Sequence, residues 1–486
     1  MFKLQGRRLW ATTTIATSSA FLLFGYDNGV LGGLVSTQPF LDAMQDPSAN
    51  MLGLIVAIYN IGCLIGCGIA AIIGFRLGRK KTLIVGCVIV VVGAAIQASS
   101  HSQGQMIAGR IVTGTGTGLI SSTVPTYLSE CSLARSRGQL VTTQLTIVAA
   151  GITLAYWLDY AFQIIFPFIS LVAITFVPET PRWLYAHGHI EAADDVLRRY
   201  RGFAIDSSEF QLEKNGILDA IKLEKTTSQM SWRDLLYDRS ELKNVRRILM
   251  GIGLQGIGQL SGINLIVYYA TTLFTQTVGL DLNTASLLGG INGIIYMVTG
   301  LVVVMLVDRI GRRPMLLFGS AGMSATMICF TILVALGGKN NGWGAVAMVF
   351  AFNTFFGLGW FSLTWLIPAE MTPLRLRHIG TATSVGSEWL FTFIIVYVAP
   401  TAISNLGWRT YLIFSIFCVL QLPFVYFLFP ETKGKTLEEM DLIFSNWSYG
   451  RVKSMSSSDL ETSAATLHEK AIQSSEVENN VLDKKN

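Results

Sequence analysis

The sequence predicts an all-α membrane protein with about twelve transmembrane helices, and three observations support this fold class. Of the 486 residues, 51% are hydrophobic and only 14% are charged, whereas about a quarter of a soluble domain is charged. The apolar residues come in runs of about 18 to 25, the length that crosses a hydrocarbon core roughly 30 Å thick. These runs lack the alternation of barrel strands, so helices are the expected spanning elements.

Twelve apolar runs separated by short polar loops are the expected spans. They cover residues 11–35, 51–74, 82–100, 106–128, 139–159, 160–177, 248–275, 284–307, 315–336, 343–366, 379–403 and 410–429. If the N-terminus is cytoplasmic, 33 of the 36 Lys and Arg residues fall in cytoplasmic segments, as the positive-inside rule requires. Both termini are therefore expected in the cytoplasm. The first run is too long for a cleavable signal and is expected to act as an uncleaved signal-anchor.

Composition also excludes several functional classes. The net charge of +5 follows from the basic cytoplasmic loops, so we expect no nucleic-acid partner. The six cysteines and five histidines show neither a disulfide framework nor metal-ligand spacing. No Ser, His and acid side chains share one depth in the membrane, so we expect no enzyme, metal or cofactor. The glycine-rich run 114–118 lacks a preceding strand and is interpreted as a close-packing helix face, not a nucleotide loop.

Three short patterns occur in the same order in each half of the chain, which indicates an internal repeat. The pairs are 78–80 (GRK) with 311–313 (GRR), Pro125 to Arg137 with Pro368 to Arg377, and 178–180 with 430–432, both PET. At the cytoplasmic ends of spans these basic residues can pair with carboxylates and helix C-termini. We expect a structural latch between the halves, with plain topology charges as the alternative. The latch residues are Arg79, Glu130, Arg137, Glu179, Arg182, Arg312, Glu370, Arg377 and Glu431.

The repeat divides the chain into four parts. We expect a first six-helix bundle at 1–178, a cytoplasmic helical linker at 179–247, a second bundle at 248–430 and a cytoplasmic tail at 431–486. Short helices are expected in the linker near 189–201 and 208–225. The tail from about residue 451 is too poor in large apolar residues to fold alone and is expected to be disordered.

The connection between the fifth and sixth spans is unusually short. Trp408 opens the last span 22 residues before Pro430, but the same distance before Pro178 reaches Tyr156, which is still inside the fifth span. Either the chain turns very tightly near Asp159 and Tyr160, or the loop and the start of the sixth span are deleted, which would impair function.

Several segments resemble the sugar porter family of the major facilitator superfamily across nearly all of 11–445. They are Gly25 to Asp27, Gly109-Arg110, Pro178 to Leu184, Gln259 to Asn264 with Tyr268-Tyr269, Asp308 to Arg313, Trp365 with Glu370, and Pro430 to Gly434. The first and fourth spans are most similar to fungal hexose and polyol proton symporters. The resemblance implies the major facilitator fold: two six-helix bundles with pseudo-two-fold symmetry, a central site and alternating access.

One acidic and one basic residue stand out inside the spans. Asp27 is the only carboxylate of the first span and Arg110 the only basic residue of the fourth. Such groups cost several kcal/mol in a membrane unless they face a partner or water. In proton-coupled members of the family the matching pair binds the coupling proton, so the resemblance implies that Asp27 and Arg110 do so here. A purely structural ion pair is the alternative.

A sugar presents hydroxyl groups and apolar C–H faces, so its site needs amides and aromatic rings. The resemblance implies that the substrate residues are Gln259, Asn264, Asn292, Trp365, Glu388 and Trp389. Buried amides that only join helices are the alternative. Three positions depart from the family pattern: Gly258 and Leu145 replace common glutamines, and Glu388 replaces a common asparagine. These changes argue against an ordinary glucose site.

The predicted function is import of a monosaccharide or polyol by proton symport. We expect a multi-pass monomer in the lipid bilayer of the plasma membrane, with the proton as coupling ion and no cofactor. An uncoupled facilitator and a non-transporting sugar sensor are the alternatives, although sensors have longer tails than residues 430–486.

Overall fold

The computed structural model describes residues 5–34, 38–131, 137–157, 165–202, 207–226, 243–277, 279–372, 377–434, 440 and 443–444. Within these ranges the ordered elements are helices, and no strand occurs. Seven described helices are long and apolar enough to cross a membrane, and a bent helix pair forms an eighth candidate span. The all-α membrane fold predicted from the hydrophobic runs is therefore confirmed.

The first half contains a helix on each of its six predicted spans. These six helices are α1 (Gly6–Leu34), α3 (Ala49–Leu77), α4 (Arg79–Ala98), α5 (Gln103–Cys131), α6 (Arg137–Trp157) and α7 (Ile165–Thr175). The short helix α2 (Gln38–Ala43) lies between the first two spans. The 11 residues of α7 rise only about 16 Å, roughly half a hydrocarbon thickness. The short connection expected around Asp159 and Tyr160 lies outside the described residues.

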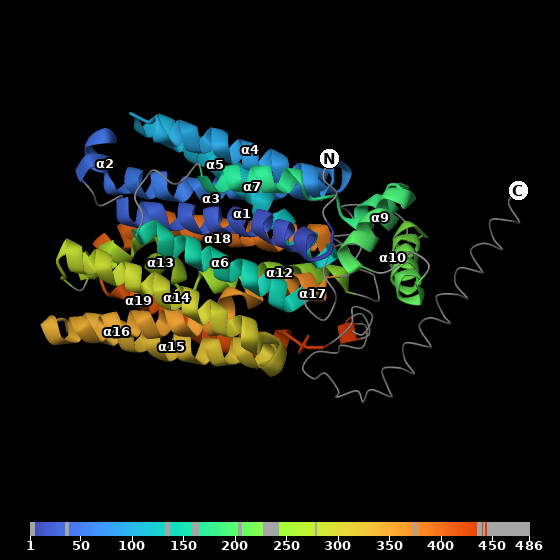
Figure 1. Ribbon diagram of the computed structural model, residues 1–486. Coiled ribbons are helices and arrows are strands. Elements are labelled where there is room, and N and C mark those ends of the chain that lie inside the picture. The colour runs from blue at the N-terminus through green and yellow to red at the C-terminus, as the bar shows by residue number, and fades with distance from the viewer. Residues whose placement is uncertain are drawn as a thin grey trace, which may run out of the picture.

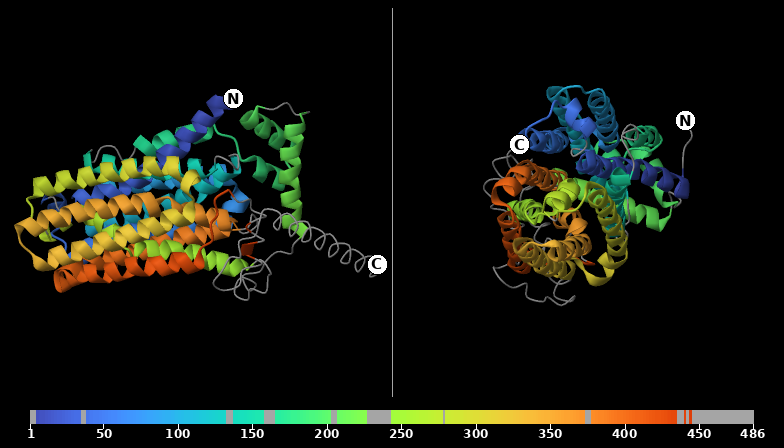
Figure 2. Two further views of the ribbon diagram at one scale, coloured as in Figure 1. Left: turned by 90° about the horizontal axis from the view of Figure 1, so that it is seen from below. Right: turned by 90° about the vertical axis from the view of Figure 1, so that its left-hand side faces the viewer.

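The second half has the same number of spans but more interruptions. Its elements are α12 (Asn244–Gln259), α13 (Ile263–Thr272), η3 (Leu273–Thr277), α14 (Leu282–Ile310), α15 (Arg312–Leu336), α16 (Lys339–Phe356), η4 (Gly357–Phe361), α17 (Leu363–Met371), α18 (Arg377–Leu406) and α19 (Arg409–Leu428). α12 and α13 meet at a 54° bend, and the π-helical turn η4 separates α16 from α17. Figure 2 shows the blue-to-cyan first half beside the yellow-to-red second half.

Three helices lie together at one end of the molecule, where they project beyond the spans (Figure 1). They are α8 (Pro181–Ala186), α9 (Ile190–Arg201) and α10 (Ser208–Thr226), and the last two lie where the sequence predicts short linker helices. Tyr200 of α9 anchors this group, because its hydroxyl lies 3.1 Å from both the Thr13 hydroxyl of α1 and the Tyr127 hydroxyl of α5. Burial raises the pKa of Tyr200, so the hydroxyl remains a hydrogen-bond donor.

The glycine-rich run in α5 is a close-packing face, as predicted. A Cβ added to Gly114 would lie 2.2 Å from the Tyr59 carbonyl oxygen of α3, and one on Gly118 would lie 2.1 Å from the Cys63 carbonyl. Gly116 faces the opposite neighbour, since its added Cβ would lie 2.6 Å from the Gly86 carbonyl of α4. α3 and α4 can approach α5 this closely only because these positions lack side chains.

The two halves meet along two long helix pairs. α3 packs along α18, and α6 packs along α14. At the end remote from α8, α9 and α10, the Thr401 hydroxyl donates a hydrogen bond of 2.8 Å to the Asn50 side-chain oxygen. Near mid-span, the Tyr268 hydroxyl of α13 donates to the Asn60 side-chain oxygen of α3 at 3.4 Å. Polar contacts thus join the halves at two depths.

Candidate functional site between the two halves

An aromatic cluster joins the halves at the centre of the molecule. Phe24 of α1 lies 6.2 Å from the Trp365 ring of α17 and 5.1 Å from the Trp389 ring of α18, measured between ring centroids. Tyr59 of α3 meets Trp389 edge to face at 6.1 Å. The two predicted tryptophans therefore face side chains of the opposite half, and they present apolar ring surface at the boundary between the halves.

The bend between α12 and α13 positions two of the predicted amides. α12 ends at Gln259, and Gly262 adopts a φ of 90°, in the left-handed region that favours glycine. This turn brings the Asn264 side-chain nitrogen to 2.8 Å from the Gln259 side-chain oxygen, and the same nitrogen donates to the Thr392 hydroxyl of α18 at 3.3 Å. The predicted pair thus forms one buried hydrogen-bonded group at a break in the helix, the kind of place where transporters bind polar substrates.

Asn292 belongs to a different contact. Its side-chain oxygen accepts a hydrogen bond of 3.1 Å from the side-chain nitrogen of Asn353, which comes from α16. Both residues are buried. The structure therefore joins Asn292 to α16, whereas Gln259 and Asn264 are joined to each other and to α18.

Asp27 and Arg110 are both buried near the aromatic cluster, with exposed fractions of 1% and 0%. Arg110 does not form the expected direct ion pair with Asp27 within the described contacts. One guanidinium nitrogen donates to the Val56 carbonyl oxygen at 3.0 Å, and the guanidinium carbon lies 4.5 Å from the centre of the Tyr59 ring. The Arg110 Nε and Nη1 atoms are buried without a hydrogen-bond partner in the described part of the chain.

Asp27 and Arg110 nevertheless lie near the same side chain. Asp27 and Arg110 both lie within electrostatic reach of the Tyr268 hydroxyl, and Glu388 does so from α18. Tyr268 therefore stands between the predicted coupling pair and the predicted substrate residues. Tyr268 belongs to one of the segments that resemble the sugar porter family, but it was not among the predicted site residues. A tyrosine in an apolar run is usually a packing residue.

Glu388 stands out among the predicted residues because part of its hydrogen-bonding capacity is unused. Its side chain is half-buried, and its Oε2 atom is buried without a hydrogen-bond partner among the described residues. The indole nitrogen of the adjacent Trp389 is likewise buried and unpartnered in the described part. Because nearly all buried polar atoms in proteins are paired, these two atoms indicate a place that a ligand or water would complete.

Sequence reasoning missed one candidate, Gln255. It is fully buried on α12, and neither its amide nitrogen nor its amide oxygen has a hydrogen-bond partner among the described residues. The signal was present in the sequence, since Gln255 precedes Gln259 by four residues and so lies on the same helix face. Its position outside the recognised motif explains the omission.

The repeated charged patterns form a compact cluster at the end of the first half that faces the linker helices. The Glu179 carboxylate accepts hydrogen bonds from the backbone nitrogens of Arg79 at 3.1 Å and Lys80 at 3.0 Å, and so caps α4. The Arg79 guanidinium donates to Glu130 at 2.8 Å, and Glu130 also accepts from the Thr180 hydroxyl at 2.8 Å. Burial raises the pKa of Glu179, and the backbone hydrogen bonds it accepts act in the opposite direction.

The second half repeats this cluster residue by residue. The Glu431 carboxylate caps α15, accepting from the backbone nitrogens of Arg312 at 2.9 Å and Arg313 at 3.1 Å. Arg312 pairs with Glu370 at 2.7 Å, and the Thr432 hydroxyl donates to Glu370. The same four contacts in the same places are direct structural support for the internal repeat.

The predicted latch between the halves stays a prediction. The described contacts of the two clusters each lie within one half, because three segments of the same half come together there. The side chains of Arg137 and Arg377 lie outside the described part, and Arg182 is half-buried in the first turn of α8. Each cluster ties the ends of its own helices and so stiffens one half as a unit.

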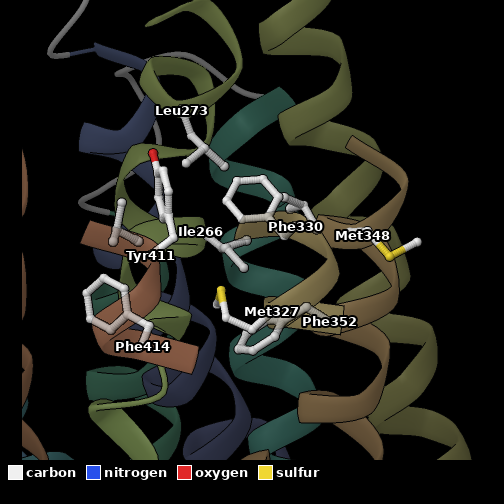
Figure 3. A pocket seen from close by; sticks show the side chains of 11 residues that line it. Ile266, Leu273, Met327, Phe330, Met348, Phe352, Tyr411 and Phe414 are labelled. Atoms are coloured by element: carbon white, nitrogen blue, oxygen red, sulfur yellow. The ribbon is translucent and has the colours of Figure 1, made fainter. Parts of the chain in front are cut away.

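A small apolar pocket lies inside the second half (Figure 3). Met327, Phe330, Phe352 and Phe414 line it together with the ring of Tyr411. Its walls come from α13, α15, α16 and α19, and none of the predicted substrate residues borders it. An apolar pocket within one half does not suit a polyhydroxylated substrate, so we place the candidate site at the boundary between the halves.

Comparison with known proteins agrees with this fold. A family model described as "Sugar (and other) transporter" matches residues 12–444. The chain is 35% identical over 464 residues to the MFS-type transporter oryC of Aspergillus oryzae, covering 90% of this chain and 86% of the relative. It is 33% identical over 471 residues to the sugar transporter STL1 of Saccharomyces cerevisiae, covering 91% and 82% of the two chains.

A solved structure shows the same architecture. The proton:xylose symporter XylE bound to 6-bromo-6-deoxy-D-glucose superposes with a TM-score of 0.78 at 25% sequence identity, covering 90% of this chain and 99% of XylE. Because it covers 90% of this chain, the match extends over both halves. The family model, the relatives and the shared architecture agree with the repeated charge clusters described above. This chain belongs to the sugar transporter family of the major facilitator superfamily.

Proposed function

We propose that this protein imports a monosaccharide or a polyol by proton symport, with alternating access to a site between its two halves. The observation that carries the proposal is the meeting of Trp365 and Trp389 with aromatic side chains of the first half, beside the hydrogen-bonded pair Gln259 and Asn264. Indole rings suit the C–H faces of a sugar, and amides suit its hydroxyls. The similarity to a proton:xylose symporter supports the same class of substrate.

The coupling part of the proposal rests on Asp27 and Arg110. Both are buried at the boundary between the halves, and both act on Tyr268, whose hydroxyl bonds to Asn60 of the first half. A proton on Asp27 changes the charge beside this cross-half contact. Proton binding can therefore bias the equilibrium between the outward-open and inward-open states, as symport requires.

The remaining parts of the proposal concern the domains and their place in the membrane. Residues 1–178 and 248–430 act as two rocking units, each stiffened by its own charge cluster, and residues 179–247 join them in the cytoplasm. Both termini are cytoplasmic, the protein works as a monomer in the plasma membrane, and the proton is the coupling ion without a cofactor.

Uptake by a yeast strain that lacks its own sugar transporters tests the proposal. Labelled glucose, xylose, glycerol and galacturonate are supplied to cells that express the wild type or Asp27→Asn at matched surface levels. We expect uptake of at least one neutral compound, faster at acidic pH, and at least a tenfold loss of accumulation in Asp27→Asn. Uptake that is equal at acidic and neutral pH and unchanged in Asp27→Asn would show an uncoupled facilitator. Absence of uptake of every neutral sugar and polyol tested would favour a sensor.

A further inference from the structure

Glu388 lies in the candidate site without the charge compensation that buried carboxylates normally have. Its Oε2 atom is buried with no hydrogen-bond partner among the described residues, and no described basic side chain lies within salt-bridge distance of it. The neighbouring Ser387 donates its hydroxyl hydrogen bond to the Ile252 carbonyl of α12 at 2.9 Å, away from Glu388. Arg110, a basic residue within a described span near the site, donates to the Val56 carbonyl oxygen and lies over the Tyr59 ring.

Among the described residues, the titratable groups that face Glu388 are neutral side chains from three other helices. They are Cys67 on α3, Tyr268 on α13 and Tyr296 on α14. Asp27 and Arg110 reach the same Tyr268 from α1 and α5. The described parts of α12, α17 and α19 bring no charged side chain to Glu388. Elsewhere in the molecule buried carboxylates are compensated: Glu370 pairs with Arg312, and Glu130 with Arg79.

These surroundings favour the neutral acid over the carboxylate. An ionised carboxylate in a low-dielectric site must be paired or hydrogen-bonded, and otherwise takes up a proton. An unpaired hydroxyl of a neutral acid costs much less than an unpaired charge. Glu388 is partly exposed, and the indole nitrogen of the adjacent Trp389 has no hydrogen-bond partner among the described residues. The Trp389 ring meets Phe24 of the first half, so Glu388 lies beside the boundary where we place the candidate site.

We propose that Glu388 is a second proton-binding site of the transporter, located in the half opposite Asp27. In its neutral form the acid O–H donates a hydrogen bond to a substrate hydroxyl, and its carbonyl oxygen can accept one, as an asparagine would at this position. The proton comes from water in the outward-open cavity and is released to water in the inward-open cavity. The inference rests on the proposed function for the identity of the substrate, but not for the protonation of Glu388.

Infrared difference spectroscopy on purified protein tests the protonation without any ligand. Wild type, Glu388→Gln and Asp27→Asn are compared at neutral and alkaline pH, in H₂O and D₂O. We expect the spectrum of wild type minus Glu388→Gln at neutral pH to contain a carboxylic acid C=O band that shifts in D₂O and is lost at alkaline pH. Wild type minus Asp27→Asn lacks this band or shows it at another frequency. A difference at neutral pH that contains only carboxylate bands would overturn the proposal.

A second measurement on the wild type covers the case in which Glu388→Gln does not fold. Dicyclohexylcarbodiimide reacts with protonated carboxyl groups in apolar surroundings, and mass spectrometry locates the product. We expect modification of Glu388 at neutral pH that falls at alkaline pH, whereas an unmodified Glu388 at neutral pH contradicts the proposal.

If the acid band is present but uptake is uncoupled from protons, the proposed symport fails and this inference stands. If the band is absent and Asp27→Asn still abolishes coupling, only this inference fails.

Discussion

At the scale of residues, buried amides divide into those with protein partners and those without. Gln421 of α19 donates its amide hydrogen bond to the Ile257 carbonyl of α12 at 2.9 Å, which is a contact within the second half. Gln255 of α12 is equally buried, but neither of its amide atoms has a partner among the described residues. A buried amide without a partner lowers the stability of the fold, so the presence of Gln255 at this position is best explained by a bound substrate or water.

This difference predicts opposite effects for two matched substitutions. Gln255→Leu should leave thermal stability unchanged or slightly higher and weaken apparent substrate affinity about tenfold, roughly 1.4 kcal/mol. Gln421→Leu should lower stability by about 1 kcal/mol, the value of one hydrogen bond, with unchanged affinity. Thermal unfolding in detergent and uptake kinetics measure both. If Gln255→Leu destabilises the fold and leaves affinity intact, Gln255 is a packing residue.

The residue identities at the site were largely predictable, and their partners were not. Polar residues inside apolar runs are conspicuous in a sequence, which is why Asp27, Arg110 and Asn264 were predicted. Which atoms meet depends on helix rotation and on bends. Arg110 therefore contacts Val56 and Tyr59 in place of a direct pair with Asp27, and Asn292 contacts Asn353.

At the scale of elements, the bend between α12 and α13 distinguishes the seventh span from its neighbours. The spans themselves were predictable because their length and hydrophobicity follow from the thickness of the membrane. The break at Gln259 to Gly262 and the π-helical turn at Gly357–Phe361 do not change the hydrophobic pattern, so hydropathy alone does not predict them. A Cβ on Gly262 would lie 2.9 Å from the Phe414 ring.

The bend predicts a strong effect of Gly262→Ala on transport. A left-handed φ costs a non-glycine residue roughly 1–3 kcal/mol, and the added methyl group also pushes Phe414. We expect the maximal uptake rate to fall at least fivefold at matched expression. Gly279→Ala is the control, because Gly279 has a φ of 80° but no atom within 4 Å of its added Cβ. Equal loss of uptake in both variants would mean that backbone strain alone, and not the bend, is responsible.

At the scale of the whole molecule, each half is held together internally and meets the other half through a limited number of polar contacts. The clusters around Glu179 and Glu431 lie within single halves, which suits rigid-body rocking better than a latch across the boundary. The repeat was predictable from motif order, but motif order alone does not say whether equivalent motifs contact each other or only their own half.

The contact between Asn50 and Thr401 allows the rocking motion to be blocked. Their side chains hydrogen-bond at 2.8 Å, at the end of α3 and α18 remote from the linker helices. Asn50→Cys with Thr401→Cys, in a Cys329→Ser background that removes the exposed native cysteine, should form a disulfide on oxidation. We expect oxidation to abolish uptake and a reducing agent to restore it, while each single cysteine variant is insensitive. Full uptake in the cross-linked protein would show that these ends do not separate during transport.

The most direct test of proton-coupled transport between the two halves is accumulation in proteoliposomes that contain only this protein. Vesicles with a neutral interior are placed in an acidic medium with a labelled neutral sugar or polyol that the yeast assay identifies. The account predicts accumulation above the external concentration, which collapses when a protonophore is added and is absent in Asp27→Asn. Equilibration to the external concentration, with no effect of the protonophore or of Asp27→Asn, would contradict it.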